Sequence, residues 1–370
     1  MSPIVGGLAV VASLFLFVMV HEAGHFLAAK MTKMKATEFF FGFGPRLFSF
    51  KFGETEYGIK AIPAGGYVRI VGMNPLEEVD PDDIGRTYRE KHFWEKSFVV
   101  LAGIGMNFAL AFALMWGVFF FGGEQQGPVP IVADVVADID GFSTPAAQAG
   151  LQVGDEFVSI DDVAITEWQD LTAYVAERAE TEVDLIILRD GVELPYTVTL
   201  TSLMFEDGTS KGFFGVAPLF PILKLGVFES AGRAGDWVGM IMVEAYGFLF
   251  DIVGNVPEIM SAVFAGQEVA PEIRPISVVG LWQIGAQADQ FGWVVMIMLM
   301  AQINIVLGAM NVLPLFPLDG GHFAVAVYEK VFRREADIRK LLPVAATVII
   351  FFIFLGVLSI YLDISQPFQF

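Results

Sequence analysis

Residues 14–29 read LFLFVMVHEAGHFLAA, an apolar stretch interrupted by two histidines and one glutamate. It belongs to a longer apolar segment, residues 4–29, which as a helix would cross a hydrocarbon core about 30 Å thick. Residues four apart on a helix lie about 40° apart around its axis, so His21 and His25 can face one metal ion while Glu22 borders the same site. The bare pattern also arises by chance, but ionisable side chains at membrane depth usually mark function. The stretch therefore predicts a metal site inside a transmembrane helix.

The composition is that of a membrane protein. The chain has 370 residues, of which 55% are hydrophobic and 36 are Phe, and its mean hydropathy is +0.61. It has no cysteine, so any metal must be held by histidine and carboxylate. The formal net charge of -20 argues against binding to nucleic acid, which needs a basic face.

Four segments are predicted to cross the membrane as helices. They are Ile4–Ala29, Phe98–Phe121, Phe291–Val312 and Pro343–Leu362. The first lacks a basic leading region, so we expect it to be retained and not cleaved as a signal peptide. A further apolar stretch, Trp237–Gly254, contains Glu244 and Asp251. We expect an amphipathic helix at the membrane surface there, with a fifth span as the alternative.

The distribution of basic residues predicts the orientation. Eleven Lys and Arg lie between the first two spans, whereas residues 122–290 carry six against 26 Asp and Glu. A second basic group lies between the last two spans, at Lys330, Arg333, Arg334, Arg339 and Lys340. Basic loops stay in the cytoplasm. Both chain termini and the long acidic segment are therefore expected outside.

A catalytic zinc ion usually has three protein ligands and one open position. The two histidines supply only two of those ligands, so a third is needed. The best candidate is Asp319, within residues 311–322, which read NVLPLFPLDGGH. Two prolines and two glycines break the helix there, and irregular backbone at membrane depth must be buried in protein or line a wet cavity. The alternative role for Asp319 is to cap a helix beginning near Gly320. His322 is a competing ligand, although a supporting role is favoured, and His92 lies among charges where a solvated or interfacial role is expected.

At this point three motifs resemble a known family. HEAGH in the first span, GIGMN at residues 103–107 and LDG at residues 318–320 resemble the site-2 protease family of intramembrane zinc metalloproteases, and their order resembles its regulator-of-sigma-E protease subgroup. The resemblance covers nearly the whole chain. It implies one Zn²⁺ held by His21, His25 and Asp319, with Glu22 as catalytic base.

The resemblance also implies roles for two asparagines. Asn311 would lie near the site, where its amide could stabilise the oxyanion, and Asn107 would pack or position substrate. Hydrogen bonding between spans is the alternative for both.

Residues 129–201 alternate short strands with helices and are not membrane-like. The strands are predicted at 131–136, 156–160, 184–189 and 195–200, with helices at 144–151 and 168–177. The run PAAQAGLQVGDEFVSIDD at 145–162 resembles a PDZ domain of bacterial envelope proteases. The chain has one such domain where some relatives carry two. Such a domain can bind an extended peptide or only shape access to the membrane site.

Short β-rich runs at 47–52, 55–62 and 67–71 predict hairpins on the cytoplasmic side. In the family, a similar segment re-enters the membrane beside the zinc and can pair with an unwound substrate. The resemblance thus implies Gly65, Gly66 and Tyr67 as substrate-positioning residues. A hairpin on the membrane surface without substrate contact is the alternative.

Together these features predict a polytopic α-helical membrane protein with four core transmembrane helices, a membrane-associated β-hairpin segment and an inserted α+β PDZ domain. The expected regions are 1–30 (first span), 31–97 (cytoplasmic hairpins), 98–122 (second span), 128–203 (PDZ domain), 204–289 (interfacial helices), 290–322 (third span and LDG), 323–342 (cytoplasmic loop) and 343–363 (last span).

The expected activity is that of a zinc metalloendopeptidase in regulated intramembrane proteolysis. It would cleave peptide bonds in or near the span of single-span membrane proteins. The resemblance implies substrates already trimmed outside by another protease, such as anti-sigma factors or signal-peptide remnants, with membrane lipids as the other partners. It also implies a location in a bacterial cytoplasmic (inner) membrane. The alternatives are a non-catalytic PDZ scaffold with structural zinc, which would not need Glu22, and a metal transporter, which would need more polar residues in the other spans.

Overall fold

The computed structural model describes residues 2–74, 77–139, 141–204 and 209–368. The chain forms two compact units: a membrane unit of residues 1–121 and 226–370, and an inserted unit of residues 122–225. Residues 205–208, near the start of the predicted 204–289 region, lie outside the described residues.

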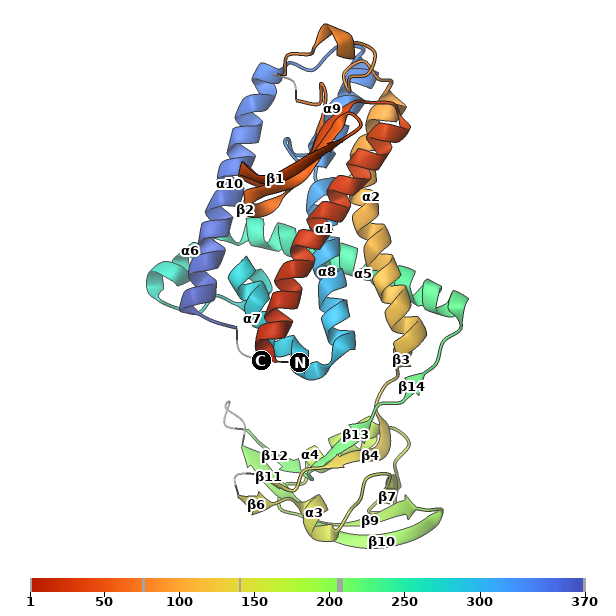
Figure 1. Cartoon of the computed structure of the whole chain (residues 1–370). Helices are drawn as coiled ribbons and strands as arrows, with labels where there is room; N and C mark the ends of the chain where they lie inside the picture. The colour runs from red at the N-terminus through yellow and green to blue at the C-terminus, as the bar shows by residue number, and fades with distance from the viewer. Residues whose placement is uncertain (1, 75–76, 140, 205–208, 369–370) are drawn as a thin grey trace. The chain divides into compact units, whose positions relative to one another are not determined.

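The membrane unit is a set of helices with one β-hairpin (Figure 1). Its elements are α1 (Pro3–Met31), β1 (Ala36–Phe52), β2 (Thr55–Ile70), α2 (Phe93–Gly117), α5 (Val227–Gly254), α6 (Val256–Ala265), α7 (Val278–Ala288), α8 (Trp293–Val312), α9 (Asp319–Phe332) and α10 (Ile338–Ser365). Five of the described helices, α1, α2, α5, α8 and α10, are long and apolar enough to cross a membrane. The polytopic helical class predicted from the sequence is confirmed.

The helix α2 begins five residues before the predicted span. His92 occupies its N-cap position, where the His92 N–H donates to the Glu95 carboxylate at 3.0 Å. The sequence prediction began at the first uninterrupted apolar run and missed this charged first turn, which satisfies a backbone donor that helices leave free.

The direction of α5 differs from that of the other long helices. In Figure 1, α5 runs crosswise to α1, α2, α8 and α10. Its length and composition would allow it to span, yet it carries Glu244 and Asp251. The position expected for residues 237–254, at the membrane surface, stays a prediction. The crosswise direction of α5 favours it over a fifth span.

The helices α1 and α2 pack with their backbones close together. A Cβ added to Gly24 would lie 2.5 Å from the Ala102 carbonyl oxygen, so only glycine allows this approach. Farther along α1, a Cβ at Gly7 would lie 2.7 Å from the Trp282 ring of α7. Small residues therefore set the spacing of α1 from its neighbours at both ends.

The hairpin is longer than predicted, because β1 also includes residues 36–46. Residues 56–59 pair with both halves of β1, and residues 66–70 pair with its first half. Gly42 and Gly44 adopt positive φ angles of 85° and 82°, which favour glycine and let β1 bend so that both halves pair with β2. The Phe-rich run 39–43 gave no strand signal because it has no polar alternation.

The inserted unit is an antiparallel sheet with two short helices. The strand order is β10-β9-β7-β4-β13, and β8 pairs with β7. Its main elements are β4 (Val129–Val135), α3 (Pro145–Ala149), β7 (Glu156–Ile160), β8 (Val163–Ala164), α4 (Trp168–Ala176), β9 (Glu182–Arg189), β10 (Val192–Thr199) and β13 (Val216–Leu219). Shorter strands are β3 (Glu124–Gln125), β5 (Asp138–Ile139), β6 (Phe142–Ser143), β11 (Thr201–Met204), β12 (Ser210–Phe213) and β14 (Ile222–Leu223).

The core of the inserted unit follows the strand alternation. Phe157, Ile160, Leu185 and Ile187 are at most 1% exposed. The helix α3 ends at Gly150, whose φ of 74° closes it in the left-handed conformation. The predicted α+β PDZ domain is present, and the ends of its six predicted elements lie within three residues of the expected ones. Its predicted end at residue 203 is wrong, because β13 pairs with β4 in the same sheet and lies in the region where interfacial helices were expected.

Candidate metal site

Three side chains from two distant parts of the chain converge on one point. His21 and His25 of α1 are 7% and 4% exposed. The Oδ2 atom of Asp319, at the start of α9, lies 2.9 Å from His21 Nε2 and 3.0 Å from His25 Nε2. The two Nε2 atoms are 3.1 Å apart. The structure thus brings together the three residues that the sequence proposed as metal ligands.

The donor set fits a zinc ion. Ligand atoms about 2.0 Å from a tetrahedral zinc are separated by about 3.3 Å, close to the spacing of these three atoms. The His25 Nδ1 atom lies 2.8 Å from the Val99 carbonyl oxygen, so it carries the ring hydrogen and leaves the Nε2 lone pair for a metal. A carboxylate oxygen and an imidazole lone pair facing one point need a cation between them.

Backbone contacts place Asp319. A Cβ at Gly320 would lie 2.1 Å from the Val312 carbonyl oxygen, and one at Gly321 would lie 2.4 Å from the Phe316 nitrogen. The loop between α8 and α9 therefore folds tightly over the first turn of α9. The two glycines that follow Asp319 are required by this close approach, and Asp319 itself occupies the first turn, next to the N-cap residue Leu318.

The helix α2 supports the His25 ring. A Cβ added to Gly103 would lie 2.3 Å from His25 Nε2, so the ring rests directly on the backbone of α2. Together with the Val99 carbonyl, one turn earlier, this contact fixes both the position and the orientation of His25. The sequence singled out Asn107 of the motif at 103–107, whereas Gly103 is the residue of that motif that contacts His25.

The β-hairpin lies beside Glu22. The Val68 N–H donates to Glu22 Oε2 at 3.0 Å. A Cβ at Gly66 would lie 2.5 Å from Met19 Sδ and 3.7 Å from Glu22 Cγ. Because the Val68 N–H points to Glu22 and not to β1, the outer edge of residues 66–70 faces the metal site.

Tyr67 and Glu38 stiffen that strand. The Tyr67 hydroxyl donates to Glu38, and its ring stacks on Phe40 at a centroid distance of 5.9 Å. Burial and the adjoining Glu38 carboxylate raise the pKa of Tyr67, so the hydroxyl stays protonated. Burial raises the pKa of Glu38, but its hydrogen bonds with Tyr67 and Arg69 outweigh that effect and leave the pKa below its ordinary value.

The other polar residues that the sequence singled out make their recorded contacts elsewhere. Asn107 is 1% exposed, and its backbone carbonyl accepts a hydrogen bond from the Asn304 amide of α8 at 2.7 Å. Asn311 donates to the Leu307 carbonyl of its own helix at 3.2 Å. The His322 ring packs on Phe316 at a centroid distance of 4.8 Å. In the described structure, neither asparagine has a hydrogen bond to the three converging side chains.

Sequence reasoning missed the groups that act through the backbone. The Val99 carbonyl and the Val68 N–H hold His25 and Glu22, and neither has a side-chain signature. Gly103 was visible as part of a motif, but its contact with His25 requires the helix packing to be known. Such positioning contacts cannot be read from one sequence.

Apolar helices long enough to cross a membrane, with a candidate metal site shared between α1 and α9, are the arrangement of a membrane-embedded metalloprotease. Residues 9–356 match Peptidase family M50, and the chain belongs to that family. The resemblance to site-2 proteases is confirmed, and the chain is an intramembrane zinc protease by family.

Curated relatives match along most of the chain. The zinc metalloprotease Rip1 of Mycobacterium tuberculosis is 32% identical, with 96% of each chain covered. A putative zinc metalloprotease of Fusobacterium nucleatum is 30% identical, with 88% of each chain covered. Among solved structures, the PDZ domain of an SdrC-like protein from Listeria monocytogenes matches 25% of this chain and 88% of its own, at 22% identity and a TM-score of 0.21.

Proposed function

We propose that the chain hydrolyses peptide bonds in or near the transmembrane segment of single-span membrane proteins, using one zinc ion held by His21, His25 and Asp319. The observation that supports this most is the convergence of the three ligand atoms within 3.1 Å of one another, with Glu22 next to His21 in the chain. A structural zinc would close its site with a fourth protein ligand and would not need a neighbouring carboxylate.

The chemistry divides between the metal and Glu22. Zinc, when bound, supplies a Lewis acid that polarises the scissile carbonyl and makes water more acidic. Glu22 accepts the proton of the attacking water and returns a proton to the departing amine. Its Oε2 already accepts the Val68 N–H, which holds the carboxylate in place. Asn311 would stabilise the developing oxyanion after releasing the Leu307 carbonyl.

The outer edge of residues 66–70 is proposed to pair with the unwound substrate. A transmembrane helix satisfies its own peptide groups, so it must be extended before its carbonyl can be attacked. A strand edge beside Glu22 offers replacement hydrogen-bond partners. Gly65 and Gly66 would let the substrate approach, with Tyr67 anchoring the strand through Glu38.

The proposed orientation follows the basic loops, with the metal site toward the cytoplasm and the termini and PDZ domain outside. Substrates trimmed outside by another protease, such as anti-sigma-factor-like proteins or signal-peptide remnants, would enter from the membrane. The PDZ domain would admit to the metal site only substrates that have already been trimmed. The bacterial inner membrane is the proposed location, and Asn107 is proposed to act through packing between α2 and α8.

The test is to co-express a single-span substrate with the wild type or with Glu22→Gln and follow the cytoplasmic fragment. The wild type should produce the fragment and Glu22→Gln should not, because the proton acceptor is lost. Glu258→Gln changes an exposed glutamate of α6 and should behave as wild type. Undiminished cleavage by Glu22→Gln would exclude the mechanism and favour a scaffold.

A further inference from the structure

A buried apolar layer borders the proposed metal site. The layer includes Ala28 of α1, three residues after His25, and Val99 of α2, whose carbonyl oxygen accepts from His25 Nδ1. On α9, Phe323 packs against the layer, four residues after Asp319. Residues three or four apart share one face of a helix. The layer therefore lies next to the ligands or their support on all three helices.

The side chain of Tyr88 lies inside this layer. It is 8% exposed and belongs to the same buried cluster as Ile70, Val99 and Val100. Among the residues that the structure describes, its hydroxyl has no hydrogen-bond partner. A buried hydroxyl without a partner is destabilising, and such a group usually serves a water molecule or another ligand.

A second buried hydroxyl adjoins the same helix. Ser97 of α2 is 4% exposed, and within the described ranges its Oγ atom has no hydrogen bond, not even to its own helix, a common partner for serine. Ser97 lies one turn after Phe93, whose ring centroid is 6.4 Å from that of Phe323. Tyr88 and Ser97 therefore both lie beside the face of α9 that carries Asp319.

Asp319 needs a hydrogen-bond donor at this place. Its Oδ2 atom faces the two imidazoles, and in the described part of the chain no other group donates to its carboxylate. A carboxylate that binds a metal normally accepts a further hydrogen bond, which sets its orientation. The other carboxylate near Tyr88 is Glu329, which is already paired with Lys96 at 3.0 Å.

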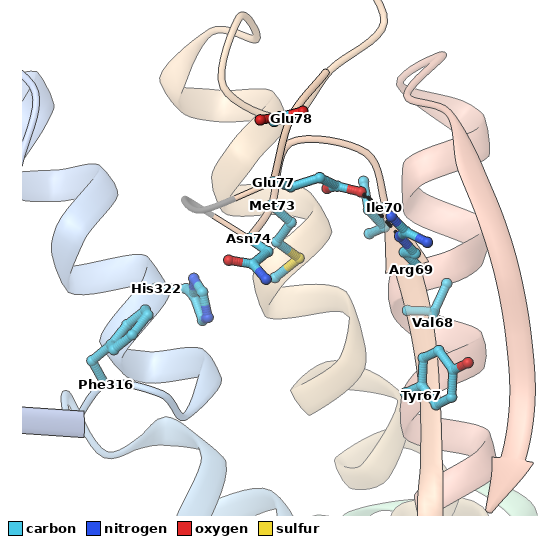
Figure 2. Close-up of a pocket in the computed structure, with 10 residues that line it drawn as sticks. All are labelled: Tyr67, Val68, Arg69, Ile70, Met73, Asn74, Glu77, Glu78, Phe316 and His322. Atoms are coloured by element: carbon cyan, nitrogen blue, oxygen red, sulfur yellow. Dashed lines mark hydrogen bonds and ion pairs between the residues drawn. The ribbon is translucent and has the colours of Figure 1, made fainter. Parts of the chain in front are cut away.

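The Tyr88 hydroxyl is a donor. Burial and the carboxylates of Glu329 and Asp319 raise the pKa of Tyr88, so the hydroxyl keeps its proton. Water can reach the layer from one side, because Ile70 and the adjoining Met73 also line a cavity of about 680 Å³ (Figure 2). A buried water molecule typically makes about three hydrogen bonds, the number that two hydroxyls and one carboxylate oxygen supply.

Resting on the proposed zinc site, we propose that one buried water molecule joins the hydroxyls of Tyr88 and Ser97 to the Asp319 carboxylate oxygen that does not face the histidines. The water accepts from the Tyr88 hydroxyl and donates to Asp319 and to Ser97 Oγ. Tyr88 and Ser97 are positioning residues, because they orient a metal ligand and do not touch the substrate.

The test is the zinc affinity of the full-length wild type, Tyr88→Phe, Ser97→Ala and the double variant, measured by competition with a chelator. Each single change should weaken zinc binding about tenfold, the lower end of the effects expected for groups that support a ligand. The double variant should bind no more weakly than the weaker single variant, because both changes remove the same water. Tyr246→Phe, which removes a hydroxyl from a half-buried position of α5, should bind zinc as the wild type does.

Two further measurements separate positioning from folding. Thermal unfolding of the metal-free protein should change little in Tyr88→Phe, because the ring and its packing remain. The visible absorption spectrum of Co²⁺ bound in place of zinc reports the geometry of the ligands. This spectrum should change in Tyr88→Phe and stay unchanged in Tyr246→Phe.

Wild-type zinc affinity with an unchanged cobalt spectrum in Tyr88→Phe would overturn the water site and leave the zinc site intact. Additive losses in the double variant would also overturn it, because the two hydroxyls would then act separately. A large loss of stability in metal-free Tyr88→Phe would assign the hydroxyl to folding instead. A wild type that binds no zinc would overturn the proposed metal site and the water site together.

Discussion

Two carboxylates of the membrane unit, Asp319 and Asp363, have opposite surroundings. Asp363 of α10 is 0% exposed, and the groups that its carboxylate contacts are all hydrogen-bond donors. Arg274 reaches its Oδ1 at 2.9 Å, while the Ser277 hydroxyl and the Gly280 N–H reach its Oδ2 at 2.6 and 3.0 Å. Asp319 instead faces two imidazole nitrogens, and His25 presents a lone pair there.

This difference distinguishes a carboxylate that the protein itself satisfies from one that is suited to bind a metal. The protein itself satisfies Asp363, which joins α10 to the start of α7 and needs nothing further. Asp319 and its partners are an acceptor-rich set that a cation completes. Burial is common to both, so the nature of the neighbours decides the role. The two carboxylates should therefore fail in different ways when they are removed.

The largest effect is expected for Asp319→Ala. Loss of the third ligand should lower cleavage by about a thousandfold or more, because the Lewis acid contributes several kcal/mol to the reaction. The measurement is fragment release from a single-span substrate by purified enzyme in detergent. Thermal unfolding of the metal-free protein should change little, and a large loss of stability instead would assign Asp319 a structural role.

Asp363→Ala should produce the reverse. The change leaves Arg274 charged and only 6% exposed without its partner, which lowers the free energy of unfolding by about 3–5 kcal/mol. The zinc content of the protein that remains folded should equal that of the wild type. Asp236→Ala, at an exposed position of α5, is the control for both measurements. Loss of zinc by Asp363→Ala without loss of stability would contradict the structural role of Asp363.

A smaller effect is expected where the backbone holds a ligand. Gly103→Ala would place a Cβ 2.3 Å from His25 Nε2 and displace the ring, so zinc affinity should fall about 10- to 100-fold. Gly105→Ala is matched to it, since a Cβ there meets nothing within 4 Å. The measurement is zinc competition with a chelator, and equal affinities for the two variants would refute the contact.

The smallest effect concerns a third carboxylate, Asp155 of the inserted unit. Burial raises its pKa, but the Arg189 guanidinium, bonded at 2.7 Å through two nitrogens, and the Gln152 N–H hold it below the ordinary value of 3.8. A carboxylate whose pKa is lower in the folded than in the unfolded state stabilises the fold at pH values above its unfolded-state pKa. This contribution is lost as the pH falls through its folded-state pKa.

Hydrogen exchange of the inserted unit in the whole protein should therefore show protection that declines below about pH 4. Asp155→Asn should have lower protection near neutral pH and less of this decline. Asp138→Asn, at an exposed position, should keep the wild-type dependence. A decline that persists unchanged in Asp155→Asn would assign it to other groups.

The sequence predicted the parts of the fold whose signals are local. Four spans follow from apolar length and the strands of the inserted domain from alternation. The ligand set of His21, His25 and Asp319 was implied by the family resemblance and stays a prediction. Asp319 was found because prolines and glycines break the chain beside a carboxylate at membrane depth. The first half of β1 was missed because its Phe-rich run 39–43 has no polar alternation.

The support for the site was less predictable than the ligands. Val99 and Val68 act through backbone atoms, and Gly103 acts through an absent side chain, so each depends on how helices and hairpin pack. The Arg274–Asp363 pair was also missed, since its members are 89 residues apart and neither belongs to a motif. Long-range packing is the part that a single sequence does not reveal.

We propose one zinc site shared between α1 and α9, with Glu22 beside it but outside the ligand set. This is tested by the zinc content per chain of purified wild type, Glu22→Gln and Asp319→Ala after dialysis against a weak chelator. We predict about one zinc in the wild type and in Glu22→Gln, and little in Asp319→Ala. Wild-type zinc content in Asp319→Ala, or loss of zinc in Glu22→Gln, would contradict the claim.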